Sequence, residues 1–146
     1  MSNLSMTRAE RDAFLADTHV AMLAIAEDGR GPFLVPVWYW YRPGGEVHVV
    51  TGGGSRKLGL IRRAGRASLC VQTETPPYKY VRIEGPIAIV GAPDHERDVR
   101  EVALRYLGPE VGEMYLAATV ADHETAVLVR LRPEHWLTAD FARFGR

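Results

Sequence analysis

The sequence predicts a mainly β protein with a few helices, in which six antiparallel strands close into a barrel or sandwich. Short runs rich in β-branched and aromatic residues recur along the chain and end at Gly or Pro turns. Mostly no helix lies between consecutive strands, which argues against a doubly wound parallel sheet. We expect closure of the sheet because it removes exposed strand edges.

The size and charge of the chain limit the function classes. Its 146 residues are enough for one domain, and we expect residues 1–146 to form a single one. Basic and acidic residues are equal at 18 each, so no net positive field is available to hold nucleic acid. No apolar run is long enough to span a membrane, and Met1–Glu10 lacks the hydrophobic stretch of a signal peptide. The single cysteine, Cys70, has no partner for an internal disulfide, so the chain is expected to be cytoplasmic. Because of its balanced charge and its lack of a membrane-spanning run, it is expected to bind neither nucleic acid nor membranes.

The first half of the chain begins with a helix and continues in strands. Thr7 and Glu10 form a capping box, which predicts a helix over 7–16. Short turns separate the next three strands, which are therefore expected to form an antiparallel meander. The strands are predicted over 19–27, 33–42 and 46–51. Ser55 is a plausible N-cap for a short helix over 55–63.

The second half contains the longest strand and the best helical pattern. Val81 and Ile83 alternate with polar residues, as in a half-buried strand. Strands are predicted over 66–73, 78–90 and 126–132, with a C-terminal tail that reaches residue 141. Two helices, Asp94–Leu107 and Glu110–Ala118, are expected within residues 94–118, because an apolar face is followed by Gly108 and Pro109.

Common catalytic and metal-binding signatures are missing from the sequence. No two of the five histidines have metal-ligand spacing, so no metal site is predicted. Cys70 lies at an alternating strand position, which favours a buried small side chain over a catalytic thiolate. No nucleophile-elbow motif occurs, and no catalytic residue can be named from the sequence.

The stretch Thr51-Gly52-Gly53-Gly54-Ser55-Arg56-Lys57 favours an anion. It is not a P-loop, because Arg56 precedes Lys57 and Leu58 follows it. Glycines allow close backbone approach, and the helix N-terminus presents free N–H groups beside two cations. A phosphate site and a Gly-rich hairpin exit with solvated charges both fit this pattern.

Four consecutive aromatic residues, Trp38, Tyr39, Trp40 and Tyr41, lie in the second predicted strand. Alternation places two rings on each face. One face meets the core, and the other leaves two large rings that need covering. A flat aromatic ligand or a dimer interface would cover them.

In order and spacing, the sequence resembles the pyridoxamine 5'-phosphate oxidase-like split β-barrels, and more narrowly their small B-type flavin/deazaflavin oxidoreductases. The resemblance extends from about Phe14 to Arg132. It is carried by Val35-Pro36-Val37-Trp38-Tyr39, the stretch Thr51–Lys57, Arg66-Ala67-Ser68-Leu69-Cys70-Val71 and Ile83-Glu84-Gly85. It implies a homodimer with FMN or the 5-deazaflavin coenzyme F-420 at the subunit interface.

The resemblance also implies roles for particular residues. The cofactor phosphate would be held by Thr51, Gly52, Gly53, Ser55, Arg56 and Lys57. The backbone of Pro36, Val37 and Trp38 would follow the tricyclic ring, and Arg62 and Arg66 would contact the deazaflavin tail. Trp40, Tyr78, Tyr80 and Trp136 would line the substrate pocket, some of them across the interface.

The implied function is a reductase that transfers a hydride to a small, planar, apolar and conjugated substrate. The chain lacks the C-terminal arginine-rich signature of true pyridoxamine-phosphate oxidases, which argues against vitamin B6 oxidation. The Ser-x-Lys at 55–57 resembles the deazaflavin-using members of the family, and this resemblance favours coenzyme F-420 over FMN. A non-catalytic module that binds a flavin, haem or another tetrapyrrole is the alternative, and a structural dimer with a degenerate site is a third possibility.

Overall fold

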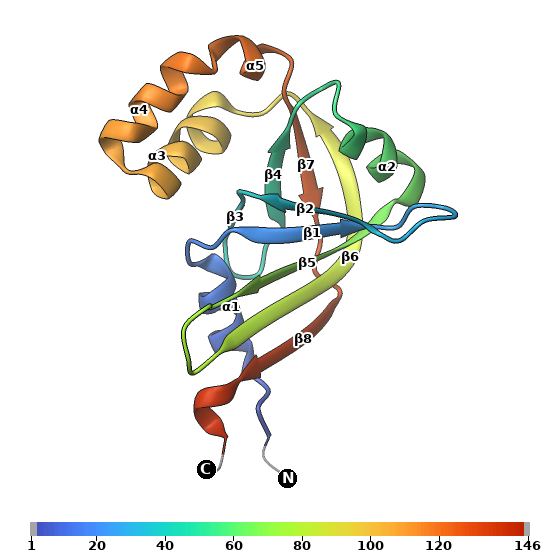
Figure 1. Ribbon diagram of the computed structural model, residues 1–146, viewed down its shortest axis with the longest axis vertical. Coiled ribbons are helices and arrows are strands. Elements are labelled where there is room, and N and C mark those ends of the chain that lie inside the picture. Colours follow the sequence, from blue (N-terminus) through green and yellow to red (C-terminus); the bar gives the residue numbers. More distant parts are fainter. Residues whose placement is uncertain (1–2, 145–146) are drawn as a thin grey trace.

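The computed structural model describes residues 3–144, whose strands form one curled antiparallel sheet (Figure 1). The strand order is β2-β1-β5-β6-β7-β4-β3, and β8 pairs separately with β6. The strands are β1 (Ala21–Ile25), β2 (Phe33–Val37), β3 (Trp40–Tyr41), β4 (Val47–Thr51), β5 (Arg66–Gln72), β6 (Lys79–Gly91), β7 (Val127–Leu131) and β8 (His135–Asp140). The mainly β, antiparallel class predicted from the sequence is confirmed.

The long strand β6 belongs to both halves of the curled sheet. Its first half pairs with β5 and β8, and its second half pairs with β7. Gly85 lies where the partners change, and a Cβ there would overlap with the main-chain carbonyl oxygen of Arg132. Only glycine permits this approach, which lets one strand turn the sheet into a half-barrel.

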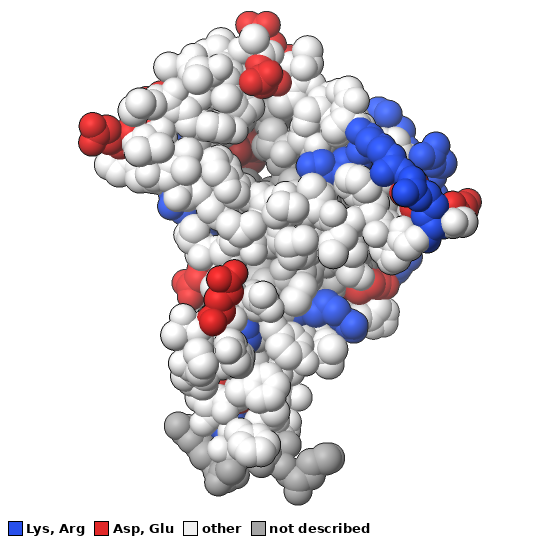
Figure 2. All heavy atoms as spheres, viewed as in Figure 1, with Lys and Arg blue, Asp and Glu red and all other residues white. Residues whose placement is uncertain are grey.

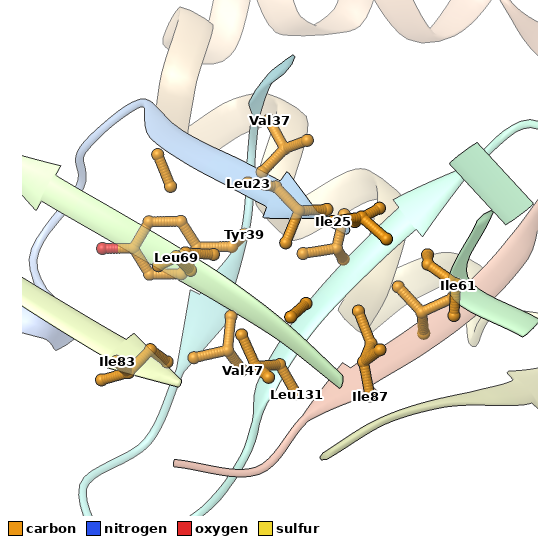
Figure 3. Packing of buried hydrophobic residues seen from close by; sticks show 14 of the residues in the cluster. Leu23, Ile25, Val37, Tyr39, Val47, Ile61, Leu69, Ile83, Ile87 and Leu131 are labelled. Atoms are coloured by element: carbon orange, nitrogen blue, oxygen red, sulfur yellow. The ribbon is translucent and has the colours of Figure 1, made fainter. Parts of the chain in front are cut away.

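The core lies inside the curl, where alternate residues of the strands point inward (Figure 3). Leu23 and Ile25 of β1 meet Leu69 of β5 and Ile83 of β6, and all four are fully buried. This period of two is what the strand alternation predicted. Burial of these side chains is the main favourable contribution to the stability of the barrel.

The N-terminal helix α1 (Arg8–Ala16) packs beside the barrel and begins as predicted. The Thr7 hydroxyl accepts from the Glu10 N–H, and the Glu10 carboxylate accepts from the Thr7 N–H at 2.8 Å. The hydroxyl of Tyr39 donates to the main-chain oxygen of Leu15 at 2.6 Å. This bond attaches the C-terminal end of α1 to the segment between β2 and β3 that contains Tyr39.

The prediction of six strands is wrong, because residues 3–144 form eight. The stretch predicted as one strand over 33–42 is broken into β2 and β3 at Trp38 and Tyr39. There the Tyr39 N–H leaves the strand ladder and donates to the hydroxyl of Tyr106. The tail expected after residue 132 contains β8, which pairs with Lys79–Glu84 of β6, followed by a 3-10 turn over Phe141–Arg143.

The predicted meander is also only partly correct. β1 and β2 do form an antiparallel pair. β2 does not continue onto β4, whose principal partner is β7, far away in the sequence. Only Trp40 and Tyr41 of the second predicted strand pair with β4.

A helical segment between β6 and β7 covers one end of the sheet (Figure 1). It comprises the π-helix η1 (His95–Arg100), α3 (Glu101–Leu107), α4 (Pro109–Ala118) and α5 (Val120–Glu124). The helix predicted over Asp94–Leu107 is therefore wound as a π-helix in its first part, and this turns Asp98 and Val99 into the interior. None of the helices in residues 3–144 is long and apolar enough to cross a membrane.

Candidate functional site

The glycine-rich turn between β4 and α2 (Arg56–Ala64) is tightly held at two points. Thr51 is buried at the end of β4, and its hydroxyl lies 3.1 Å from that of Ser55. Ser55 occupies the N-cap position, but its side chain makes no capping bond. A Cβ on Gly53 would overlap with the Thr125 carbonyl oxygen, whereas Gly54 has open space around it. One glycine is therefore required by packing, and another leaves room for a ligand.

Lys57, in the first turn of α2, faces an open hollow of about 390 Å³. The other lining residues are apolar or aromatic: Val20, Pro36, Val37, Trp38, Val50 and Tyr115. Within residues 3–144, Lys57 makes no ion pair, although its side chain is half-buried. Burial lowers the pKa of Lys57, because the charged ammonium loses hydration that nothing replaces. A half-buried cation without a counter-ion favours the binding of an anionic group.

The arginines predicted to assist Lys57 do not line this hollow. Arg56 pairs with Glu27, and its guanidinium lies 5.3 Å from the ring centre of Phe33. Arg62 is exposed in the last turn of α2. Arg66 pairs with Glu84 at 2.7 Å and with Glu134 at 2.8 Å.

Lys and Arg side chains nevertheless gather over α2 on the face seen in Figure 2. Basic residues of this helix are present at both of its ends: Arg56, Lys57, Arg62 and Arg63. Among them, Lys57 alone lines the hollow, so the predicted cation cluster reduces to one lysine with a positive surface nearby.

The aromatic run is covered by the chain's own helices and not left open. The ring of Trp38 stacks on Tyr106, with centroids 4.9 Å apart and an interplanar angle of 7°. Tyr115 lies tilted against the same indole at 5.3 Å. Tyr39 and Tyr41 are buried toward the barrel. The expectation that two rings need a ligand or a dimer for cover is therefore wrong, and Trp38 keeps only part of its surface for the hollow.

Trp40 is held by a different set of side chains. Its indole N–H donates to Asp98 Oδ1 at 2.9 Å, and its ring centre lies 3.7 Å from that of His48. The guanidinium groups of Arg42 and Arg97 lie over the ring at 5.4 and 5.5 Å. Trp40 does not line the hollow beside Lys57.

Asp98 and His48 are unusual titratable groups beside this tryptophan. Burial alone would raise the pKa of Asp98, but hydrogen bonds from Arg97, Trp40 and the Asp94 N–H outweigh burial and lower it. Asp98 is therefore an ionised and fully hydrogen-bonded carboxylate. Burial lowers the pKa of His48 to about 4, so its imidazole is neutral near pH 7.

The other predicted pocket residues lie elsewhere in the subunit. Tyr78 is half exposed just before β6, and Tyr80 lies opposite Ala139 of β8. Trp136 of β8 packs under the guanidinium of Arg11 at 4.1 Å. β8 lies at the end of the molecule opposite α3–α5 (Figure 1). Within one chain, these side chains do not meet the hollow.

Three further lining residues, Val20, Val50 and Tyr115, were not singled out from the sequence. They come from the residue before β1, from β4 and from α4, so no local motif connects them. His48 was noted only as one of five histidines. In residues 3–144, no three His, Cys, Asp or Glu side chains are grouped as a metal site would require.

The fold is a curled antiparallel half-barrel. Its candidate site is a hollow that contains one lysine and lies beside a glycine-rich turn. A family model for pyridoxamine 5'-phosphate oxidase matches residues 7–137. The chain belongs to this family, as its sequence motifs indicated. A relative named as an F420H(2)-dependent reductase supports a family that includes deazaflavin-using oxidoreductases.

Individual proteins support the same assignment. The chain is 32% identical over 107 residues to an F420H(2)-dependent biliverdin reductase of Mycobacterium tuberculosis, covering 70% of this chain and 76% of the relative. The crystal structure of the conserved hypothetical protein Rv2991 from Mycobacterium tuberculosis superposes with a TM-score of 0.80 and 26% identity, covering 100% of this chain and 92% of that one. A structure described as an F420 reductase matches with a TM-score of 0.62 at 18% identity, covering 86% of this chain and 94% of that one, and it supports the fold alone.

Proposed function

We propose that this protein is an oxidoreductase that binds coenzyme F-420, in preference to FMN, beside Lys57 and transfers a hydride to a planar conjugated molecule. The observation that carries the proposal is the half-buried, unpaired ammonium of Lys57 in an otherwise apolar and aromatic hollow. The phosphate of such a cofactor supplies the missing anion, and its ring supplies a flat apolar face. The 32% identical relative, named for its dependence on F420H(2), favours the deazaflavin.

The volume and the lining of the hollow suit the binding of a small molecule with an anionic group and a flat apolar ring. Its volume of about 390 Å³ lies in the usual range of small-molecule sites. Gly54 leaves open space beside the helix N-terminus, where backbone N–H groups favour an anion. Lys57 would hold the phosphate, and the segment Pro36–Trp38 would follow the ring along one wall of the hollow.

The chain's own residues would orient the reactants. When bound, the reduced cofactor supplies the hydride, and the chemistry of that transfer belongs to the cofactor. Trp38 and Tyr115 present aromatic surface to the hollow, so a planar substrate packs against them. The stack of Trp38 on Tyr106 fixes the position of this wall before any ligand arrives.

A second copy of the chain would complete the site. Leu34 is 60% exposed, Val20 is 57% exposed, and Met22 and Leu137 are also exposed. The ladders place Met22 opposite Pro36 and Cys70, on the outer face of the sheet. Val20 and Pro36 also line the hollow, so a partner that covers this apolar face would close the cofactor site as well. We therefore include a homodimer in the proposal.

Separate titrations of the purified protein with FMN and with coenzyme F-420, followed by cofactor fluorescence, test the proposal. Saturable micromolar binding of F-420 with weaker FMN binding supports it, and the reverse order makes FMN the cofactor. Binding of neither overturns it.

Turnover separates the enzyme from a binding module. Oxidation of bound reduced F-420 by a planar acceptor such as menadione supports a reductase. It is measured by the return of the absorbance of oxidised F-420. Tight binding without turnover of several acceptors, or a haem Soret band on the purified protein, favours the non-catalytic module.

A further inference from the structure

A second, smaller pocket lies behind Trp38. Its volume is about 70 Å³, and His48, Asp98 and His123 are its titratable lining residues. It shares Trp38, Val50 and Tyr115 with the hollow beside Lys57. The pocket and the hollow are therefore neighbours that have these three side chains as common walls.

His48 has an unused hydrogen-bonding atom. Its Nδ1 is buried and has no hydrogen-bond partner among the residues that the structure describes. Buried polar atoms without a partner are rare in folded proteins and require an explanation. A neutral imidazole carries one N–H and one lone pair. Because Nδ1 is closed off from solvent, the lone pair suits Nδ1 and the N–H suits Nε2, through which His48 can donate a single hydrogen bond to a ligand in the pocket that it lines.

The charges around His48 determine which ligand group suits it. Asp98 already accepts hydrogen bonds from Trp40, from Arg97 and from the Asp94 N–H, so both of its oxygens are in use. Asp98 has the largest charge effect on the imidazole, and Arg130, Arg97 and Arg42 oppose it. Because the N–H of a neutral imidazole donates and the Asp98 oxygens are already in use, the pocket suits an oxygen acceptor and offers no free carboxylate to a cationic or donor group.

The size of the pocket limits the ligand further. A water molecule occupies about 30 Å³ in the liquid, so the pocket holds a group of only a few heavy atoms. A carbonyl or carboxylate group fits, whereas a fused ring system does not. The ring of a substrate would remain in the larger hollow.

We infer that this pocket is the inner end of the substrate site, where His48 donates a hydrogen bond to a carbonyl or carboxylate oxygen on the planar substrate. The inference rests on the proposed function and narrows its substrates to conjugated compounds that bear such an oxygen. His48 is then a specificity-determining residue, and Trp40 and Asp98 position the side chain by packing and charge.

Binding without cofactor gives the first test. Protein labelled with ¹⁵N at histidine is titrated with acetate and with cinnamate, a planar conjugated carboxylate, and the imidazole nitrogens are followed by NMR. We expect a saturable shift of the His48 resonances, stronger with cinnamate, while exposed His95 stays unchanged. Unshifted His48 signals in both titrations would overturn the inference.

Kinetics of the holoenzyme with menadione give the second test. His48→Phe should raise KM about 3- to 10-fold, the range for the loss of one neutral hydrogen bond, and leave the cofactor Kd unchanged. His48→Gln retains a donor and should recover part of the loss. His95→Phe, the matched control on the surface of η1, should behave as wild type.

The outcomes distinguish this inference from the proposed function. If wild type binds neither cofactor, the proposed function fails, while the histidine titration still decides whether the pocket accepts an oxygen ligand. If the cofactor binds and His48→Phe retains the wild-type KM, the inference fails and the proposed function survives. Heat-unfolding of both His48 variants checks that neither effect comes from misfolding.

Discussion

Tyr106 lies parallel to Trp38, with the two ring centres 4.9 Å apart, and joins the helical segment to the break between β2 and β3. Its hydroxyl accepts from the Tyr39 N–H at 3.2 Å and donates to the main-chain oxygen of His19. One side chain thus supports the aromatic wall of the hollow and satisfies the backbone that left the strand ladder.

Removing this hydroxyl should destabilise the fold without removing the stack. Tyr106→Phe leaves the Tyr39 N–H without its partner, so we expect the free energy of unfolding to fall by about 1–3 kcal/mol. Tyr115→Phe is the control, because the Tyr115 hydroxyl makes no hydrogen bond within residues 3–144. Urea unfolding followed by tryptophan fluorescence measures both, and equal stabilities of the two variants would contradict the assigned role.

Lys57 should matter for binding and not for stability. Lys57→Ala removes a charge-assisted phosphate contact, worth about 1.5–3 kcal/mol, so the cofactor Kd should rise at least about tenfold. Lys57→Met should leave the unfolding free energy of the cofactor-free protein unchanged or higher, because the buried part of an unpaired ammonium is replaced by an apolar side chain. Lys79→Ala, at the only other lysine, is the control. An unchanged Kd in Lys57→Ala would exclude the phosphate contact.

The glycines of the turn should separate by function. Gly53→Ala forces its new methyl group against the Thr125 carbonyl, so a loss of about 1–3 kcal/mol in unfolding free energy is expected. Gly54→Ala has free space and should change that value by less than about 0.5 kcal/mol. If the cofactor approaches this backbone, Gly54→Ala still weakens binding in a titration. Wild-type affinity in Gly54→Ala would place the cofactor away from the turn.

The stability of the protein should depend on pH through His48. Above pH 6.5, the ordinary pKa of histidine, the imidazole is neutral in the folded and unfolded states. As the pH falls from 6.5 to about 4, the unfolded chain takes up a proton that the folded chain rejects, so stability is lost. His48→Phe lacks this proton uptake, so its Tm should fall less than that of wild type as the pH is lowered across this window. A constant difference in Tm between pH 7 and pH 4 would show that the folded-state pKa is not lowered.

Dimer formation and cofactor affinity should be lost together. Leu34→Glu places a charge on the exposed apolar face of the sheet, whose burial in an interface would then leave that charge unpaired. Sedimentation should show a shift from dimer to monomer, with a weaker cofactor Kd. Val111→Glu is the control: Val111 is also an exposed apolar residue, but it lies on α4, so this variant should remain dimeric. A monomeric wild type would remove the homodimer from the proposed function.

Local patterns predicted most elements because their causes are local. The capping box at Thr7 and Glu10 and the alternation at Val81 and Ile83 depend on neighbouring residues alone, and both are confirmed. The break after Val37 depends on Tyr106, which is supplied by a helix far along the chain. No pattern within the strand itself could indicate it.

The same reasoning applies to the candidate site. Lys57 follows a glycine-rich turn that is readable in the sequence, and it does line the hollow. Arg66 has the same charge, but it forms ion pairs with Glu84 and Glu134. These two partners come from β6 and from the turn before β8. Sequence spacing reveals which residues carry charge, whereas tertiary pairing decides which charge remains available.

The pairing of β4 with β7 has a consequence for how the protein is made. Thr51, which leads into the turn before Lys57, lies opposite Val127. A chain emerging from the ribosome can close the β5–β6 hairpin early, because its two strands are neighbours in the sequence. The ladder beneath the turn must wait until the whole helical segment has been synthesised, so the hollow is among the last parts of the nascent protein to acquire its shape.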